Sequence, residues 1–441
     1  MANNDQWYEL DNAAKIIPST TVGADTRVFR ICCELREEVQ ADILQRALDK
    51  TIREFPHFNC ILKRGLFWYY LEASSRRPEV FEENLPPCSM LYRKGGKNLL
   101  YRLFYYKRRI SLEMFHVLTD GTGAFVFLKS IVSNYLIERY HLDPNVKLEE
   151  PSSVKEKEGD AFRHFYSEKE RKKKNWLKAG KPPRAYRLKG EKNENLEIQL
   201  LEGTVSAKKL LDKAHEYHTT LAVLVTAVYI EAIMQEMTVR ERKYPVVISV
   251  PVNLRNYFPS HTTRNFFGVI NVPVFYGDYD GTVDGIVEKV RRSFQEMLSE
   301  DQVFHTMNGY AALEHNRAVK LVPLVFKDLG IRGFSTMMQK GVTSTVSNVG
   351  RVVMPETLAP YIEKFSSFMS TNRVQMCISS FQDKLTFGVT SAYTDHTMIM
   401  HFFRRLVDLG IPVELAVTGD NAQEVKKRAV LQKMQDKHKR K

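Results

Sequence analysis

One histidine and one aspartate in this sequence have a spacing that could support acid–base chemistry. They lie four residues apart in FHVLTDG, residues 115–121. His116 follows an apolar run typical of a strand, and loops at strand ends present side chains to clefts. A histidine held there can accept a substrate proton near neutral pH, so we predict that His116 is a general base. A buried structural histidine before an ordinary Asp-Gly turn is the alternative.

Other kinds of chemistry have weaker support. His116 and Asp120 could share a metal ion, but no third ligand is evident, and Gly121 and Gly123 argue against a helix that would align the pair. The sequence has no GxSxG nucleophile motif, no GxxxxGK phosphate loop and no GxGxxG dinucleotide motif. We therefore expect no metal, no tightly bound cofactor and no covalent enzyme intermediate.

The cysteines form no metal or redox motif. Their number is odd, and no two of them have the CxxC spacing. The cysteines are Cys32, Cys33, Cys60, Cys88 and Cys377. Reduced, mostly buried thiols are expected, which favours the cytoplasm. The first 17 residues carry acids where a signal peptide would be basic and apolar, and the longest apolar run, 221–230, ends at Glu231. We expect neither export nor a transmembrane segment.

The formal charge of +13 is concentrated in two segments. Residues 155–192 carry a net charge of +8 and residues 425–441 carry +7, so the rest of the chain is close to neutral. Lys172, Lys173 and Lys174 could recognise the phosphates of a donor, or the segment could be a solvated linker. The tail could touch an anionic membrane or RNA weakly, but we expect no nucleic-acid partner.

The elements before and after His116 follow from hydrophobic spacing. Strands are predicted at 26–35, 66–71, 99–106 and 110–115, the last two joined in a hairpin at 107–109. Helices are predicted from Val39 to Phe55 and from Ala124 to Tyr140. These elements place His116 at the end of a strand and before a long helix.

The second half has a similar content. Strands are predicted at 196–201, 245–250, 268–275, 343–347, 373–380 and 385–393. Helices are predicted at 206–218 and 220–237, capped by Ser206 and Thr220, and at 282–299, 323–339, 357–369 and 396–409. The chain of 441 residues thus belongs to the α/β or α+β class. We divide it into an N-terminal half, 1–154, a basic crossover or linker, 155–192, a C-terminal half, 193–424, and a basic tail, 425–441.

The HxxxDG segment resembles the signature of the chloramphenicol acetyltransferase-like superfamily, which includes alcohol acetyltransferases, wax ester synthases and the condensation domains of peptide synthetases. PVNLR (251–255), NFFG (265–268) and SNVG (347–350) resemble three further family segments in the same order and spacing. The resemblance covers nearly the whole chain and is closest to bacterial alcohol acetyltransferase-like proteins. Condensation domains usually have two adjacent histidines, and Phe115 replaces the first; the second, which is the catalytic one, matches His116.

The resemblance implies a fold and a mechanism. Two similar subdomains would form a pseudo-dimer around a central tunnel, with the acyl donor entering from one face and the acceptor from the other. His116 would take the proton of an acceptor hydroxyl or amine as it attacks a thioester, without a covalent acyl-enzyme. Asp120 would point away from the substrate and pair with an arginine. Arg255 is the candidate, with a solvated Arg255 as the alternative.

The resemblance also suggests supporting residues. Ser347 and Asn348 could donate hydrogen bonds to the oxyanion of the tetrahedral intermediate, or simply form a turn. Gly121 and Gly123 could let the backbone approach the reacting centre, or make a turn, and we favour both roles at once.

We therefore expect a monomeric acyltransferase that uses acyl-CoA and a small alcohol or amine, with an acyl carrier protein as another conceivable donor. The alternative is a non-catalytic or condensation-like protein that binds a carrier protein or a lipid.

Overall fold

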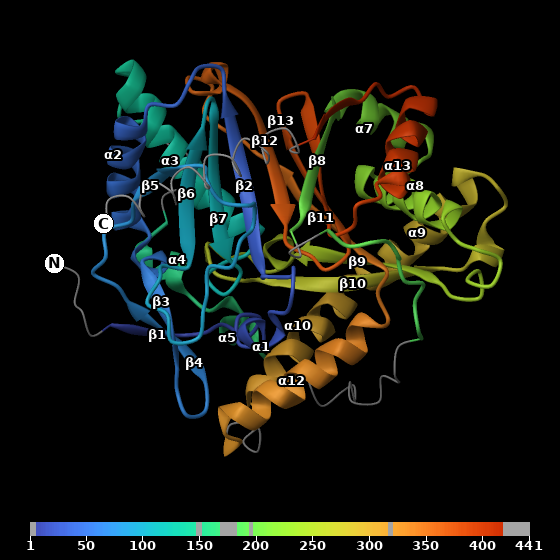
Figure 1. Cartoon of the computed structure of the whole chain (residues 1–441), viewed down its shortest axis with the longest axis horizontal. Coiled ribbons are helices and arrows are strands. Elements are labelled where there is room, and N and C mark those ends of the chain that lie inside the picture. Colours follow the sequence, from blue (N-terminus) through green and yellow to red (C-terminus); the bar gives the residue numbers. More distant parts are fainter. Residues whose placement is uncertain (1–5, 147–151, 168–182, 194–196, 316–320, 418–441) are drawn as a thin grey trace, which may run out of the picture.

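The chain forms two halves that lie side by side, each a β-sheet with helices packed on its outer side (Figure 1). The computed structural model describes residues 6–146, 152–167, 183–193, 197–315 and 321–417. The predicted tail, 425–441, and the lysines at 172–174 lie outside these residues. The mixture of strands and helices agrees with the predicted fold class.

The N-terminal half is built on a five-stranded sheet with the order β12-β2-β7-β6-β5. Its strands are β2 (Val28–Leu35), β5 (Val80–Glu82), β6 (Tyr101–Tyr106), β7 (Arg109–Phe115) and β12 (Ile362–Met369). A small sheet contains β1 (Trp7–Glu9), β4 (Tyr69–Ala73) and β3 (Cys60–Arg64). The helices are α1 (Ile17–Thr20), α2 (Ala41–Thr51) and α3 (Gly121–Tyr140). Two short helices, α4 (Val154–Glu158) and α5 (Ala161–Phe165), follow in the predicted linker, and Phe162 of α5 packs against Phe266 of the C-terminal half.

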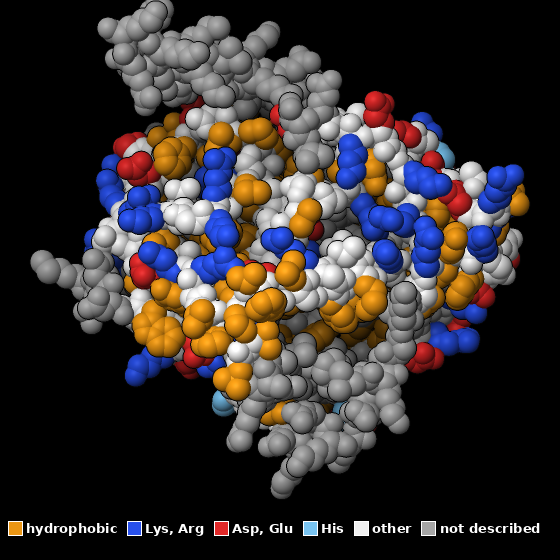
Figure 2. All heavy atoms as spheres, turned by 60° about the horizontal axis from the view of Figure 1, so that its bottom comes forward, with side chains coloured by type: hydrophobic (Ala, Val, Ile, Leu, Met, Phe, Trp, Pro, Cys, Tyr) orange, Lys and Arg blue, Asp and Glu red, His pale blue; other side chains and the backbone are white. Residues whose placement is uncertain are grey.

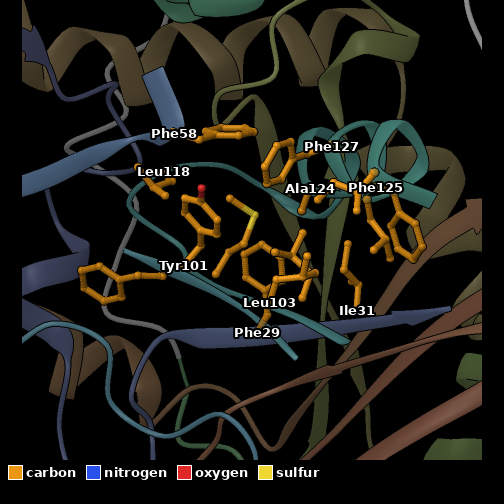
Figure 3. Close-up of a cluster of buried hydrophobic side chains, with 14 of the residues drawn as sticks. Phe29, Ile31, Phe58, Tyr101, Leu103, Leu118, Ala124, Phe125 and Phe127 are labelled. Atoms are coloured by element: carbon orange, nitrogen blue, oxygen red, sulfur yellow. The ribbon is translucent and has the colours of Figure 1, made fainter. Parts of the chain in front are cut away.

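An apolar core holds α3 against this sheet. Figure 3 shows side chains of α3, including Phe125 and Phe127, gathered with Ile31 of β2 and Tyr101 of β6. Phe127 is fully buried, and its ring centroid lies 5.6 Å from that of Tyr101 and 5.1 Å from that of Phe58. Burial of large aromatic side chains fixes the helix on the sheet, and the helix start carries the HxxxDG segment.

The C-terminal half is built on a seven-stranded sheet with the order β10-β9-β11-β13-β14-β8-β15. Its strands are β8 (Gln199–Ser206), β9 (Val246–Asn253), β10 (Phe267–Val274), β11 (Ser344–Arg351), β13 (Val374–Phe381), β14 (Lys384–Ser391) and β15 (Glu414–Val417). The helices are α7 (Ala207–Glu216), α8 (Leu221–Gln235), α9 (Val283–Met297), α10 (Glu300–His315), α12 (Leu324–Gln339) and α13 (Thr397–Asp408). Short 3₁₀ turns occupy 52–54, 56–58, 254–256, 276–278 and 359–361.

The two predicted helix caps are confirmed. The Ser206 hydroxyl accepts from the Lys209 N–H at 3.2 Å, and the Thr220 hydroxyl accepts from the Val223 N–H at 3.4 Å. Within the described ranges, no single helix has both the length and the apolar run of a membrane span. Taken together, α7 and α8 have the length and composition of a membrane span, but the chain bends by 84° between them.

The predicted helix at 357–369 is wrong, because residues 362–369 form β12. This strand leaves the C-terminal half and pairs antiparallel with β2 of the N-terminal sheet. The pairing shifts register between Ile362 and Lys364, so the buried residues Ile362 and Phe365 are three apart rather than two. A bulge in a strand thus produced a spacing that resembles a helix.

Several other boundaries also differ from expectation, and helix α10 was not predicted; two of the differences have a clear local cause. The strand predicted at 66–71 begins only at Tyr69, because Leu66 and Phe67 lie in the turn between β3 and β4. The helix predicted from Ala124 begins at Gly121, since Asp120 caps it. The glycines therefore lie inside the first helical turn, contrary to our expectation of a non-helical segment.

The two halves meet tightly where β14 passes β12. A Cβ added at Gly388 of β14 would lie 2.0 Å from the backbone oxygen of Ser367 in β12. We predict that Gly388→Ala lowers the free energy of unfolding by about 2 kcal/mol or more, because backbone must move to admit the methyl group. Chemical denaturation measures the change.

Gly309→Ala in α10 is the matched control, since nothing lies within 4 Å of its Cβ position. It should stabilise the protein by up to about 1 kcal/mol through helix propensity. Equal stability of the two variants would contradict the proposed contact between the halves.

Candidate active site

His116 lies directly after β7, at the junction of the two halves. Its ring is partly buried between aromatic side chains of both halves, with centroids 5.2 Å from Phe29 of β2 and 5.5 Å from Phe267 of β10. Burial lowers the pKa of His116 below its ordinary value of 6.5, although the nearby Asp120 carboxylate acts in the opposite direction. The imidazole is therefore neutral at pH 7.

Asn265 determines which nitrogen of His116 carries the proton. The Asn265 amide nitrogen donates to the Asp11 carboxylate at 3.1 Å and to the His116 carbonyl at 3.0 Å. Both partners are acceptors, so the other end of the amide, Oδ1, is an acceptor itself. Oδ1 lies 3.0 Å from Nδ1 of His116, and Nδ1 must donate to it. The proton is thus held on Nδ1, and Nε2 has a free lone pair.

Asp11 supports this arrangement from the beginning of the chain. Its carboxylate is fully buried, and burial raises its pKa to about 6. Arg264 lies 3.6 Å away, and the backbone N–H of Ala14 donates to the same carboxylate at 2.8 Å. The group is therefore ionised at pH 7 and accepts from Asn265.

Asp120 makes three interactions, two of which cross to the C-terminal half. One carboxylate oxygen accepts from the Gly123 N–H at 3.0 Å and caps α3. The other accepts from Arg255 and from the Phe266 N–H, both at 2.8 Å. Arg255 follows β9 and Phe266 precedes β10, so the structure contains the expected Asp120–Arg255 ion pair, and it spans the halves.

Arg255 in turn holds the segment before β10. Its guanidinium donates to the carbonyl oxygens of Thr262, at 3.0 Å, and Arg264, at 2.6 Å. Because Asn265 lies directly after these residues, the ion pair also fixes the residue that orients His116.

The two glycines of the motif have different surroundings. A Cβ at Gly123 would lie 2.1 Å from the Thr263 oxygen and 2.3 Å from the Thr119 hydroxyl, so only glycine fits there. At Gly121 a Cβ would meet Val349 at 3.6 Å, an ordinary contact. The contact shows that the end of β11 lies beside the motif.

Ser347 and Asn348 come from that part of β11. Ser347 is half-buried, whereas Asn348 is exposed and its Oδ1 accepts from the Gly350 N–H at 3.0 Å. The Asn348 side chain therefore closes a turn here, and its expected part in an oxyanion hole stays a prediction, as does that of Ser347.

Phe115 and the cysteines contribute no group to this site. Phe115 is buried in the core and stacks on Tyr92 with centroids 5.8 Å apart. All five cysteines are free and buried, and burial raises the pKa of each thiol. None is therefore a thiolate near pH 7. In the described ranges, no three His, Cys, Asp or Glu side chains group as metal ligands.

Sequence reasoning missed two residues of the site. Asn265 appeared only as part of the NFFG segment, and no sequence pattern connected Asp11 with His116, which is 105 residues away. A polar residue at the start of an apolar strand, as Asn265 is, was the one available signal.

The fold is shared with solved structures of low sequence identity. Polyketide synthase associated protein 5 from Mycobacterium tuberculosis matches with a TM-score of 0.60 and 14% identity, covering 92% of this chain and 98% of the other. Trichothecene 15-O-acetyltransferase from Fusarium sporotrichioides matches with a TM-score of 0.57 and 10% identity, covering 91% and 94%.

A mutant starter condensation domain of rhizomide synthetase, solved in complex with C8-CoA and Leu-SNAC, matches with a TM-score of 0.58 and 12% identity, covering 90% of this chain and 92% of the other.

No family model matches this chain, and no curated protein does. The chain therefore has the fold of the chloramphenicol acetyltransferase-like and condensation-domain proteins that its motif resembles.

We predict that Asp120→Ala lowers the free energy of unfolding by about 3–5 kcal/mol, because it leaves Arg255 without its carboxylate at a site where both side chains are nearly buried. Denaturant unfolding followed by circular dichroism measures the loss.

Asp42→Ala is the control, since the Asp42–Arg46 pair is exposed on α2 and its removal should leave the unfolding midpoint nearly unchanged. Similar midpoints for both variants would contradict a structural role for Asp120.

Proposed function

We propose that this chain is an acyltransferase that moves an acyl group from a thioester to a hydroxyl or amine, with His116 as general base. The observation that carries the proposal is the hydrogen bond from Nδ1 of His116 to Asn265, which keeps Nε2 unprotonated. The low pKa of the buried ring acts in the same direction. The shared fold, which also occurs in an acetyltransferase, supports acyl transfer.

The proposed reaction uses one base for both proton transfers. Nε2 of His116 removes the acceptor proton as the acceptor oxygen or nitrogen attacks the thioester carbonyl. A new bond forms to the carbonyl carbon, and its oxygen becomes an oxyanion, for which Ser347 and Asn348 are our candidate donors. When the oxyanion collapses, the carbon–sulfur bond breaks and the imidazolium returns the proton to the thiolate. The enzyme itself is never acylated.

Asp120 and Arg255 act as positioning residues in this scheme. They fix the start of α3 and the segment that carries Asn265. A misplaced Asn265 would no longer hold the proton on Nδ1, and both tautomers of His116 would be populated.

Acyl-CoA is the proposed donor. One structural neighbour was solved with C8-CoA, which supports a CoA thioester but concerns that protein. A small alcohol or amine is the proposed acceptor, as in the alcohol acetyltransferase-like group.

An acyl carrier protein is the second candidate for the donor, since several structural neighbours are condensation domains. Phe115 in place of the first histidine usual in condensation domains favours simple transfer. A cytoplasmic location remains part of the proposal.

We predict that His116→Ala lowers thiol release from acyl-CoA by at least about a hundredfold while the unfolding midpoint stays close to that of the wild type. The assay uses a panel of acyl-CoAs with alcohols and amines. His215→Ala on the exposed surface of α7 is the matched control and should react at the wild-type rate. Normal turnover by the His116→Ala protein would eliminate this mechanism.

The pH dependence gives a separate test. Catalysis needs neutral His116, so activity is lost as the pH falls through the folded-state pKa, which burial holds below 6.5. We predict that kcat/KM is constant at pH 7 and above until other groups titrate, and declines only below about pH 6.5. An acidic limb centred above pH 7 would be inconsistent with a desolvated, neutral base.

A further inference from the structure

Helix α12 contacts the protein through the buried Leu324 and several polar side chains, whereas other large apolar side chains of the helix are exposed. Asp328 accepts from the Ser19 hydroxyl at 2.5 Å and from the Tyr69 hydroxyl at 3.1 Å. The Lys327 ammonium donates to the Phe67 oxygen at 3.0 Å and lies over the Trp68 ring. Arg332 donates to the Ser19 oxygen at 3.0 Å. Apart from Leu324, the helix is thus attached mainly through polar contacts, unlike an ordinary surface helix, whose apolar side faces the core.

The outward side of α12 continues into neighbouring segments. Six large apolar side chains are between 55% and 75% exposed: Leu66, Leu321, Val325, Phe326, Leu329 and Phe334. The turn that carries Leu66 is joined to the helix by a hydrogen bond from the Leu324 N–H to the Leu66 oxygen at 2.9 Å. We call these six residues the α12 face. Exposed apolar clusters of this kind mark interaction surfaces.

The α12 face lies at an end of the molecule. Helix α12 runs along the lower edge in Figure 1, and Figure 2, which turns that end forward, shows hydrophobic side chains gathered there with Lys and Arg side chains beside them. A helix of 16 residues offers an edge about 24 Å long, which suits a flat partner.

The charge of the side chains around the α12 face distinguishes between the partners that could bind there. Lys15, which lies over the same Trp68 ring as Lys327, is partly exposed, and Arg332 and Lys340 of this region are exposed. The one acid of the helix, Asp328, is part-buried in its hydrogen bonds to Ser19 and Tyr69. A second copy of this chain would bring two positively charged segments together, and the tail at 425–441, with a net charge of +7, would also be repelled. An anionic lipid surface complements these side chains, because it offers both negative headgroups and an extended apolar layer.

We propose that the α12 face docks on the surface of an anionic lipid bilayer. Phe326 and Leu329 enter the boundary between headgroups and acyl chains, and the exposed side chains of Arg332 and Lys340 contact the headgroups. The proposal does not depend on His116, so a variant can lose membrane binding and keep its catalytic activity, or the reverse.

Sedimentation of the full chain with vesicles tests the proposal. The probes are vesicles of phosphatidylcholine alone and of phosphatidylcholine with phosphatidylglycerol. We expect the wild type to bind the anionic vesicles more strongly, with binding weakened by salt. The double variant Phe326→Ser/Leu329→Ser should bind at least about tenfold more weakly. Its circular dichroism and thiol-release rate on a water-soluble substrate should equal those of the wild type.

Val239→Ser/Val407→Ser is the matched control, because both side chains are exposed apolar residues elsewhere on the C-terminal half. It should bind like the wild type. Absence of vesicle binding, or full binding by the Phe326/Leu329 variant, would overturn the proposal. So would loss of binding on deletion of residues 425–441 alone, or a dimer that the Phe326/Leu329 variant dissociates, measured by light scattering.

Discussion

The shared carboxylate of Asp120 is the interaction on which the candidate site depends. It caps α3 in the N-terminal half and accepts from Arg255 and from the Phe266 N–H in the C-terminal half. Arg255 and Asp120 are both largely shielded from water, where an unpaired charge is costly. The two halves therefore keep one relative position at this point, and a base on one half is oriented by an amide on the other.

That orientation explains how a single histidine could serve as a base without a carboxylate partner on its ring. A charged partner on Nδ1 would raise the pKa of His116, whereas the neutral amide of Asn265 fixes the tautomer with a smaller effect. The buried Asp11 carboxylate lies one step further away, and its hydrogen bond orients the amide. Phe29 and Phe267 limit rotation of the ring from opposite halves.

Local patterns in the sequence predicted much of the fold, because most elements have an apolar face with a regular period and recognisable caps such as Ser206 and Thr220. The error at 357–369 arose where a bulge changed that period, and β12 pairs with β2, more than 300 residues earlier. Position 116 was found from a local motif, but Asn265 and Asp11 are linked to it only by the folded chain. No local pattern predicted the exposed apolar side chains of α12, because the contacts of its polar side chains with Ser19, Phe67 and Tyr69 exist only in the folded chain.

The central claim is direct acyl transfer assisted by a neutral His116. The most direct measurement is thiol release from acyl-CoA at increasing acceptor concentration, with samples quenched during turnover for intact-protein mass spectrometry. Our account predicts that release rises with acceptor concentration and that the mass of the protein stays unchanged. An acyl adduct on the protein, or no release with any acyl-CoA and acceptor of the panel, would contradict it.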